Sequence, residues 1–499
     1  MGSTQTGLIR LLNCSSSSLY WKIALIHYYT DKTISAGAFI EQSIQKLTAA
    51  VGEFPQAQHF VIQFSHTQYY LPEQPQLELI ALVSVGVENS VSVLIEGSIF
   101  LFTPEHLEQL QLLPEHLSEG VGGAHPLHEY CCSHSLPWVV ISAPWLLAPI
   151  NIPKPWGQEI WYTGIEVRGQ AGVVGDNGNI PLPWLLELMS WRIGLPDRTQ
   201  PILLKVLDPL PDEVYGDLYF ELHQEKQEVY VVTHIDHKAW PEGVGAIQLG
   251  FASQARKRYE TDDAFKQAYL DSVKAYEQVR RLVDAQLDDK KIAAGIGAKQ
   301  PATNLQLINW ISELSQYPEN KELVDKEIQL RKAMNSFVEE YPLVVGDVVT
   351  VPKLVPHALQ HGVRVVEFQT PVYERKILSF GQKVLTQAHW DTEEALELVN
   401  LGGGSLQSPE LVSIAPEFHV ERIVNFNDFE VQRIQLDGHY LLGGDVYSIL
   451  MVLQGELALG TAGRMSNFSS GQALMLPKVG EGYAITSSAP CTFLLAFPR

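Results

Sequence analysis

Three side chains suited to metal binding or proton transfer lie close together near residue 220. Apolar and polar residues alternate over residues 217–223, which is typical of a β-strand, and this period places Glu221 and His223 on one face. Glu228 follows a short turn and opens the next expected strand. Imidazoles and carboxylates bind divalent metals and also serve as general acids and bases. The simpler interpretation is a strand face that contacts only water. The prediction of a site therefore needs a second group of ligand residues elsewhere in the sequence.

This stretch resembles the first of the two sequence motifs of the cupin superfamily. In that motif a glycine precedes a His-x-His pair and a later glutamate. Here Gly216, Glu221, His223 and Glu228 take these places, with Glu221 standing where the motif has its first histidine.

The second cupin motif is found more than a hundred residues later. Gly346, Pro352 and His357 have its spacing: a glycine, five residues, a proline, a short turn and a final histidine. Leu354 stands where the motif prefers glycine. The resemblance implies a small β-barrel whose inward faces turn Glu221, His223, Glu228 and His357 toward one ion. Two imidazoles and two carboxylates suit Zn²⁺, and also Fe²⁺ or Mn²⁺.

A similar run near the C-terminus has no metal ligands. Gly471-QALML-Pro477 repeats the glycine-to-proline spacing, but glycines and Glu481 follow where a histidine would be needed. The preceding stretch, residues 450–459, contains no histidine. We therefore expect a second, degenerate cupin-like barrel that binds no metal.

Further segments over residues 154–499 resemble the type I phosphomannose isomerases. They are Lys154-Pro-Trp-Gly157, the run LLELMSW at 185–191, the run PILLKVLD at 201–208, Lys226-Gln-Glu228, Glu367-Phe-Gln369 followed by Arg375, and Phe418-His-Val-Glu-Arg422. The resemblance implies isomerisation of mannose 6-phosphate to fructose 6-phosphate, or of a related sugar, through an enediol, with a metal that is usually zinc.

The resemblance also assigns roles to individual residues. Arg375 would stabilise the enediolate charge, and Lys226 would bind the substrate close to the metal. The general base stays open between Glu367 and an unbound neighbour of the metal. The simpler interpretations are that Arg375 pairs with Glu374 on the surface, and that Lys226 lies in a solvated turn.

Three departures from the family bear on this prediction. Glu221 replaces a glutamine, so that two carboxylates would neutralise a divalent ion and weaken it as a Lewis acid. The loop between His223 and Lys226 is short, and the segment before Arg375 reads QTPVYER, which differs from the family pattern. Two alternatives therefore remain: a non-catalytic cupin that binds sugar or has a regulatory role, and another metal-dependent cupin enzyme such as an iron oxygenase.

Composition limits the classes of partner. The chain has 499 residues and a net charge of −22, which disfavours binding to nucleic acid or to a membrane surface and leaves a small-molecule sugar or sugar phosphate as the expected partner. Four cysteines without a C-x-x-C spacing do not form a disulfide framework, so we expect a cytoplasmic protein.

Periodicity and proline placement predict the domain organisation of a mainly β chain. We expect an α+β N-terminal domain of unknown role at residues 1–150. The metal-binding cupin domain should comprise residues 151–255 and 341–385, with a helical insertion at 256–340 and the degenerate cupin domain at 386–499. Helices are expected at 183–193, 262–289 and 322–340, where apolar residues recur with helical spacing.

Overall fold

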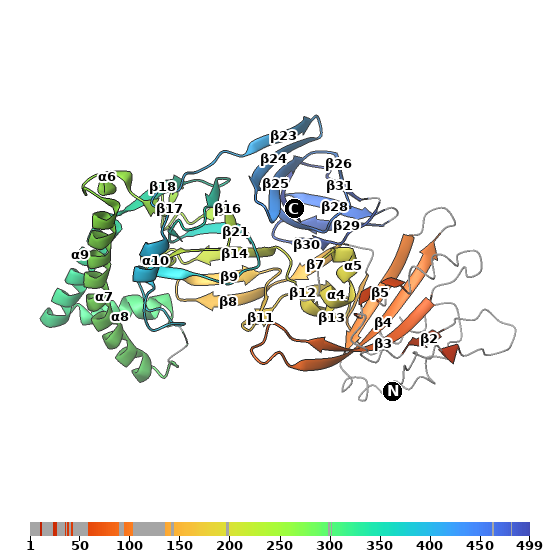
Figure 1. Cartoon of the computed structure of the whole chain (residues 1–499), viewed down its shortest axis with the longest axis horizontal. Helices are drawn as coiled ribbons and strands as arrows, with labels where there is room; N and C mark the ends of the chain where they lie inside the picture. Colours follow the sequence, from red (N-terminus) through yellow and green to blue (C-terminus); the bar gives the residue numbers. More distant parts are fainter. Residues whose placement is uncertain are drawn as a thin grey trace, which may run out of the picture.

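Strands predominate in this chain. The structure is a computed structural model that describes residues 10–11, 23–26, 35, 37–38, 41–42, 58–88, 94–102, 135–140, 144–195, 199–297, 300, 302–461, 464–480 and 482–499. Figure 1 shows the long helices at one end of the molecule, an N-terminal sheet at the other, and the remaining sheets between them. The expected mainly β fold with few helices is confirmed.

The described N-terminal residues form a six-stranded sheet in sequential order. Its strands are β1 (Arg10–Leu11), β2 (Ile23–Ile26), β3 (Gln58–Thr67), β4 (Gln76–Glu88), β5 (Leu94–Phe102) and β6 (Trp138–Val140). Phe64, Leu79 and Ala81 of this sheet are buried in one continuous core with Trp145 and Leu185. The N-terminal sheet therefore packs directly on the rest of the protein.

Two antiparallel sheets pack face to face in the middle of the chain. The six-stranded one has the order β19-β16-β21-β14-β9-β8, and the five-stranded one has the order β18-β17-β20-β15-β22. The first contains β8 (Ile150–Lys154), β9 (Gly157–Trp161), β14 (Leu203–Pro209), β16 (Glu228–Ile235), β19 (Val348–Val351) and β21 (Val363–Gln369). The second contains β15 (Phe220–Leu222), β17 (Gly245–Phe251), β18 (Val338–Leu343), β20 (His357–Leu359) and β22 (Lys376–Ser379).

The six-stranded sheet is buried on both faces. Leu207, Tyr230 and Val365 point into the core that it shares with the five-stranded sheet. The intervening residues Val206 and Val366 point to the opposite face, where they join the core of the C-terminal strands. Burial on both faces explains the valine-rich, nearly continuous apolar runs of these strands.

Three helices follow β17: the first and the third pack on the outer face of the five-stranded sheet, and the second packs against these two helices. They are α7 (Asp262–Ala293), α8 (Asn304–Leu314) and α9 (Pro318–Asn335), preceded by the short α6 (Ser253–Arg256). The side chain of Thr261 caps the N-terminus of α7, and Thr303 forms a capping box with Gln306 at α8. Phe265 and Tyr269 pack with residues of β15 and β17 in one core. These helices lie between β17 and β18. Here α7 is longer than the helix predicted at 262–289, α9 lies earlier than the one predicted at 322–340, and α8 was not predicted.

The C-terminal strands form a nine-stranded and a four-stranded sheet, with the orders β13-β12-β7-β30-β27-β32-β25-β24-β23 and β26-β31-β28-β29. They are β23 (Glu410–Ala415), β24 (Phe418–Asn425), β25 (Phe429–Leu436), β26 (His439–Leu442), β27 (Ser448–Gln454), β28 (Glu456–Thr461), β29 (Arg464–Ser469), β30 (Ala473–Leu476), β31 (Tyr483–Thr486) and β32 (Cys491–Pro498). The nine-stranded sheet also takes in β7 (Trp145–Ala148), β12 (Gly172–Gly175) and β13 (Gly178–Pro181), which precede the central sheets in sequence.

Short elements complete the described chain. They are β10 (Ile165–Glu166), β11 (Gly169–Gln170), α4 (Leu182–Leu188), α5 (Ser190–Ile193) and α10 (Thr392–Leu398). The helix expected at 183–193 is divided at Met189 into α4 and α5, and α10 was not predicted.

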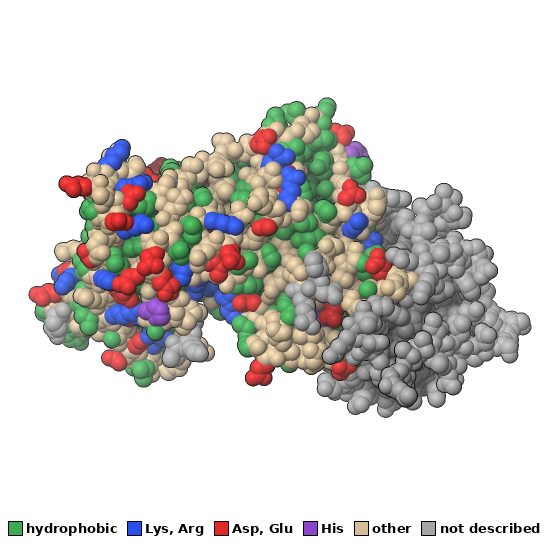
Figure 2. Space-filling view, viewed as in Figure 1, with side chains coloured by type: hydrophobic (Ala, Val, Ile, Leu, Met, Phe, Trp, Pro, Cys, Tyr) green, Lys and Arg blue, Asp and Glu red, His purple; other side chains and the backbone are tan. Residues whose placement is uncertain are grey.

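The surface of the described residues carries charged side chains of both signs. On the face shown in Figure 2, acidic and basic side chains are mixed over the described residues. Among those residues, no helix is both long and apolar enough to span a membrane.

Candidate metal centre

The candidate site lies between the two central sheets, at one end of their shared interior. Toward the other end, inward-facing positions are apolar, as at Leu207 and Val365. Two residues away on the same strands the inward positions are Lys205 and Glu367, which are paired across β14 and β21. The period of two therefore continues through both regions, but its inward face changes from apolar to charged.

Strand pairing brings the predicted ligands together. Glu221 on β15 is directly opposite His357 on β20, and His223 follows two residues after Glu221. Glu228 begins β16 in the facing sheet, where it is opposite Val351 and Gln369. The ligating atoms of His223, Glu228 and His357 lie within 4.8 Å of one another, and all three residues are buried.

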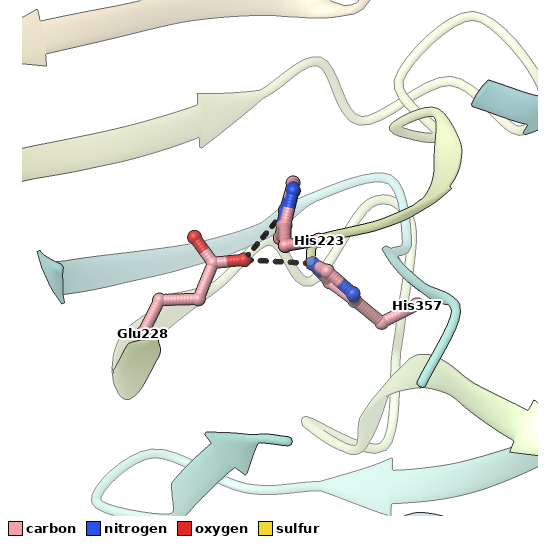
Figure 3. A group of neighbouring side chains, drawn as sticks. All are labelled: His223, Glu228 and His357. Atoms are coloured by element: carbon pink, nitrogen blue, oxygen red, sulfur yellow. Dashed lines mark ion pairs between the residues drawn. The ribbon is translucent and has the colours of Figure 1, made fainter. Parts of the chain in front are cut away.

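Glu228 lies at the centre of this group. Its Oε1 is 3.0 Å from His223 Nε2 and 2.9 Å from His357 Nε2. Figure 3 shows both imidazole rings directed at the same carboxylate oxygen. The rings meet edge to face with centroids 5.1 Å apart.

The hydrogen bonds of the two rings favour a cation at this point. His223 Nδ1 lies 3.0 Å from the carbonyl oxygen of Glu374, and His357 Nδ1 lies 3.3 Å from that of Val355. A carbonyl oxygen only accepts, so Nδ1 carries the hydrogen and the Nε2 of each neutral ring presents a lone pair. Burial, and next the charge of Lys226, lower the pKa of His223 and favour this neutral form.

With both rings neutral, three electron-pair donors converge on a small volume. In the part of the chain that the structure describes, His223 Nε2 is buried and has no hydrogen-bond partner of acceptable geometry. A divalent cation would satisfy all three atoms, and two imidazoles with a carboxylate are a common ligand set for Zn²⁺, Fe²⁺ and Mn²⁺. The residues present therefore fit a metal.

Glu221 lies beside this group. Its Oε1 is 3.9 Å from His223 Nε2, and its Oε2 is 3.8 Å from Arg375 Nη1. Its side chain keeps 17% of its surface exposed, whereas that of Glu228 keeps 1%. The structure therefore places Glu221 between the His/Glu cluster and Arg375.

Lys226 is buried against Glu228 and does not lie in a solvated turn. Its Nζ is 3.0 Å from Glu228 Oε2. Burial alone would raise the pKa of Glu228, but the charge of Lys226 is the largest opposing influence, and this pKa is held well below its ordinary value. Burial likewise opposes the charge of Lys226, yet the neighbouring Glu228 carboxylate raises its pKa. Both partners of the ion pair are therefore charged at neutral pH.

Glu367 is the second buried carboxyl of the site. It is 2% exposed, and burial together with the neighbouring Glu228 raises its pKa well above the ordinary value, although Lys205 acts in the opposite direction. Lys205 Nζ lies 3.8 Å from Glu367 Oε2 and 2.7 Å from Gln369 Oε1. Glu367 is thus held in its protonated form, next to an ionised Glu228.

The sequence interpretation did not single out Lys205 or Glu159. Glu159 Oε1 is 2.9 Å from Lys154 Nζ, its Oε2 accepts a hydrogen bond from Trp161 Nε1, and Lys205 Nζ is 3.9 Å away. Burial opposes the charge of Glu159, but Lys154 and Lys205 outweigh it and lower its pKa. The signal available in the sequence was a lysine inside an otherwise apolar strand, since such a lysine needs a partner when buried.

Arg375 faces the site and is not paired with Glu374. Its guanidinium lies 4.6 Å from the ring centroid of Tyr219, and its Nη2 donates a hydrogen bond to Thr386 Oγ1 over 2.9 Å. Its side chain is 25% exposed. These contacts leave the guanidinium near Glu221 and partly open to solvent.

Leu354 has the backbone conformation that explains the preference of the second motif for glycine. Its φ is +64°, which is strained for a leucine. Its N–H donates to the carbonyl oxygen of His223 over 2.7 Å, and its own carbonyl accepts from Asn400. The left-handed turn thus ties the loop before His357 to the strand end that carries His223.

Solved structures similar to this chain include phosphomannose isomerases. The mannose 6-phosphate isomerase of Bacillus subtilis has 14% identity and a TM-score of 0.49, covering 71% of this chain and 99% of that one. A variant of phosphomannose isomerase from Salmonella typhimurium has 13% identity and a TM-score of 0.49, with the same coverage. The expected resemblance to this family is confirmed. A zinc-bound mannose 6-phosphate isomerase has 13% identity and a TM-score of 0.46, covering 72% of this chain and all of that one.

No family model matches this sequence, and no curated protein matches it. Because the identities are low and the TM-scores lie below 0.5, we take nothing about activity from these likenesses. The case for function rests on the geometry of the site.

Proposed function

We propose that this protein is a metal-dependent aldose–ketose isomerase acting on mannose 6-phosphate or a related sugar phosphate. The observation that carries the proposal is the convergence of His223, Glu228 and His357, all buried, with the Nδ1 of each ring directed at a backbone carbonyl oxygen, beside charged Lys226. In this proposal the two central sheets are the metal-binding cupin barrel, and the C-terminal sheets are a second barrel with an apolar interior.

His223, Glu228 and His357 would hold the ion, and in this proposal Glu221 lies beside the ion without binding it. Zn²⁺ is our first candidate and Fe²⁺ or Mn²⁺ the alternatives. When bound, the metal would supply Lewis-acid polarisation of the sugar oxygens.

The chain's own cations would stabilise the charge of the substrate and of the enediolate. Arg375 is held by Thr386 and the Tyr219 ring, so that its guanidinium is fixed where it meets Glu221 and solvent. Lys226 is fixed by Glu228 and remains charged. Fixed cations in a buried site stabilise developing negative charge without having to reorganise.

The two carboxyls that do not belong to the His/Glu cluster differ in protonation. Glu367 retains its own proton because burial raises its pKa, so it is a poor base in this state and a suitable acid. Glu221 is partly exposed and has an Oε2 without a hydrogen-bond partner among the described residues. We therefore favour Glu221 as the group that moves the proton between the two sugar carbons.

A coupled assay of fructose 6-phosphate formation from mannose 6-phosphate tests the proposal. Metal analysis of the same preparation should find about one ion per chain. His357→Ala should lose both the metal and the activity, whereas His361→Ala should keep both, because His361 is bound to Asp217 and stacked on Trp240. A His357→Ala protein with a full complement of metal would contradict the proposed site.

One observation favours a second candidate. Two histidines and one carboxylate are also the ligand set of non-haem Fe²⁺ oxygenases, which leaves open positions for oxygen. Iron in the purified protein, together with no turnover of sugar phosphates, would favour that enzyme class.

A further inference from the structure

The side chain of Glu374 fills the turn that carries the metal-site residues. Its Oε1 accepts hydrogen bonds from three successive backbone N–H groups, those of Gln224 at 2.7 Å, Glu225 at 3.0 Å and Lys226 at 3.2 Å. Such a run of amides facing one point forms an anion-binding concavity. In this protein the anion is a carboxylate of the same chain.

The backbone of Glu374 contacts the same region. Its carbonyl oxygen accepts the hydrogen bond of His223 Nδ1, so one residue holds both the ring and the turn that follows it. The turn ends at Lys226, which pairs with Glu228 of the His/Glu cluster.

Among the described residues, the other backbone hydrogen bonds of this turn lie at its two ends. The carbonyl oxygen of His223 accepts from the N–H of Leu354, and the N–H of Gln227 donates to Thr370 Oγ1. Between these ends, the three N–H groups bonded to Glu374 would otherwise depend on water. Removing a charged acceptor from several amides leaves each of them to find a new partner, and frees the turn to change conformation.

We propose that Glu374 is a positioning residue, which fixes the turn at 224–226 and thereby the relative placement of His223, Lys226 and Glu228. Its carboxylate binds the backbone of the turn, and its carbonyl oxygen binds the His223 ring. The inference rests on the proposed metal centre, but the order of the turn does not depend on the presence of a metal. The short loop between His223 and Glu228 is thus stabilised from the segment that precedes Arg375.

Side-chain substitutions separate the two contacts. Glu374→Ala removes the acceptor of the three amides and leaves the carbonyl that orients His223 in place. Glu374→Gln keeps one acceptor oxygen of nearly the same reach but loses the charge, so the three amides should exchange at rates between those of wild type and Glu374→Ala. Glu225→Ala is a matched control, since its side chain is exposed in the same turn and its N–H remains.

The first measurement is hydrogen exchange of the amides of residues 224–226 in metal-free protein. We expect exchange at least about tenfold faster in Glu374→Ala, near wild-type exchange in Glu225→Ala, and intermediate rates in Glu374→Gln. Unchanged exchange in Glu374→Ala would overturn the proposal. If Glu374→Ala does not fold, the comparison of Glu374→Gln with Glu225→Ala decides: unchanged exchange in Glu374→Gln relative to Glu225→Ala would overturn it.

The second measurement is Zn²⁺ affinity by competition with a chelator, followed by kcat and KM. Loss of an outer contact of a metal site weakens binding by about 10–100-fold, and we expect this range for Glu374→Ala with recovery in Glu374→Gln. Affinity within twofold of wild type in Glu374→Ala would refute a role in positioning the ligands. Wild-type protein that binds no divalent metal would refute the proposed function instead, and the exchange experiment would still decide whether Glu374 orders the turn.

Discussion

Neutralising one partner of the Glu228–Lys226 ion pair should lower the free energy of unfolding by a large amount. Glu228 is 1% exposed and the side chain of Lys226 10%, with 3.0 Å between Glu228 Oε2 and Lys226 Nζ. Glu228→Gln leaves the ammonium buried without its partner, and breaking a buried pair in this way costs about 3–5 kcal/mol. We expect the lower end, about 3 kcal/mol, because Glu367 can ionise and replace part of the lost charge.

The assay is thermal unfolding of the metal-free protein at pH 7, with EDTA present so that metal binding does not add to the result. For a unit of 150–250 residues, about 3 kcal/mol corresponds to a decrease of roughly 6–12 °C in Tm. Lys226→Met should also destabilise, although less, since His223 can take up a proton and compensate Glu228. The double variant should recover much of the loss because it buries no unpaired charge.

The double-mutant cycle makes the reasoning refutable. Residues in direct contact have interaction energies of about 0.5–3 kcal/mol, and we expect this pair near the upper end. Strictly additive effects, or a decrease below about 2 °C for Glu228→Gln, would show that the pair is not the buried, charged contact described above. As a control, Glu394→Gln removes the exposed partner of Lys376 and should change Tm little.

Three further outcomes are expected. Arg375→Ala should lower kcat at least about a hundredfold while the metal content stays unchanged, and an unaltered rate would remove its assigned role. The folded-state pKa of Glu159 is lowered, so its contribution to stability is present above its unfolded pKa of about 4.3 and is lost as pH falls further. Glu159→Gln should therefore lower Tm at pH 7, and its difference in Tm from wild type should shrink below about pH 4. A difference in Tm that does not change with pH would contradict this. Leu354→Gly removes strain of about 1 kcal/mol at φ +64° but also side-chain packing, so Tm should change by only a few degrees, and a large decrease would show that packing dominates.

The sequence by itself predicted the features that depend on local periodicity. The period of two placed Glu221 and His223 on one strand face, and the register of β15 and β20 indeed sets Glu221 opposite His357. The 3.6-residue pattern predicted the start of α7, where Thr261 caps the helix. Such patterns are readable because the backbone geometry of a strand or helix alone decides which side chains share a face.

Only the tertiary structure decided the properties that depend on burial and on distant segments. Glu367 keeps its proton because it is buried and because the pairing of β16 with β21 places Glu228 next to it. No local sequence pattern shows that these two carboxyls are neighbours. Glu374 reaches the turn at 224–226 from about 150 residues away. Likewise, β7 and β12 join the C-terminal strands in one sheet although they precede the central sheets in sequence. Charge states and long-range pairings follow from the whole packed arrangement, since desolvation and Coulomb energies depend on neighbours that the local sequence does not specify.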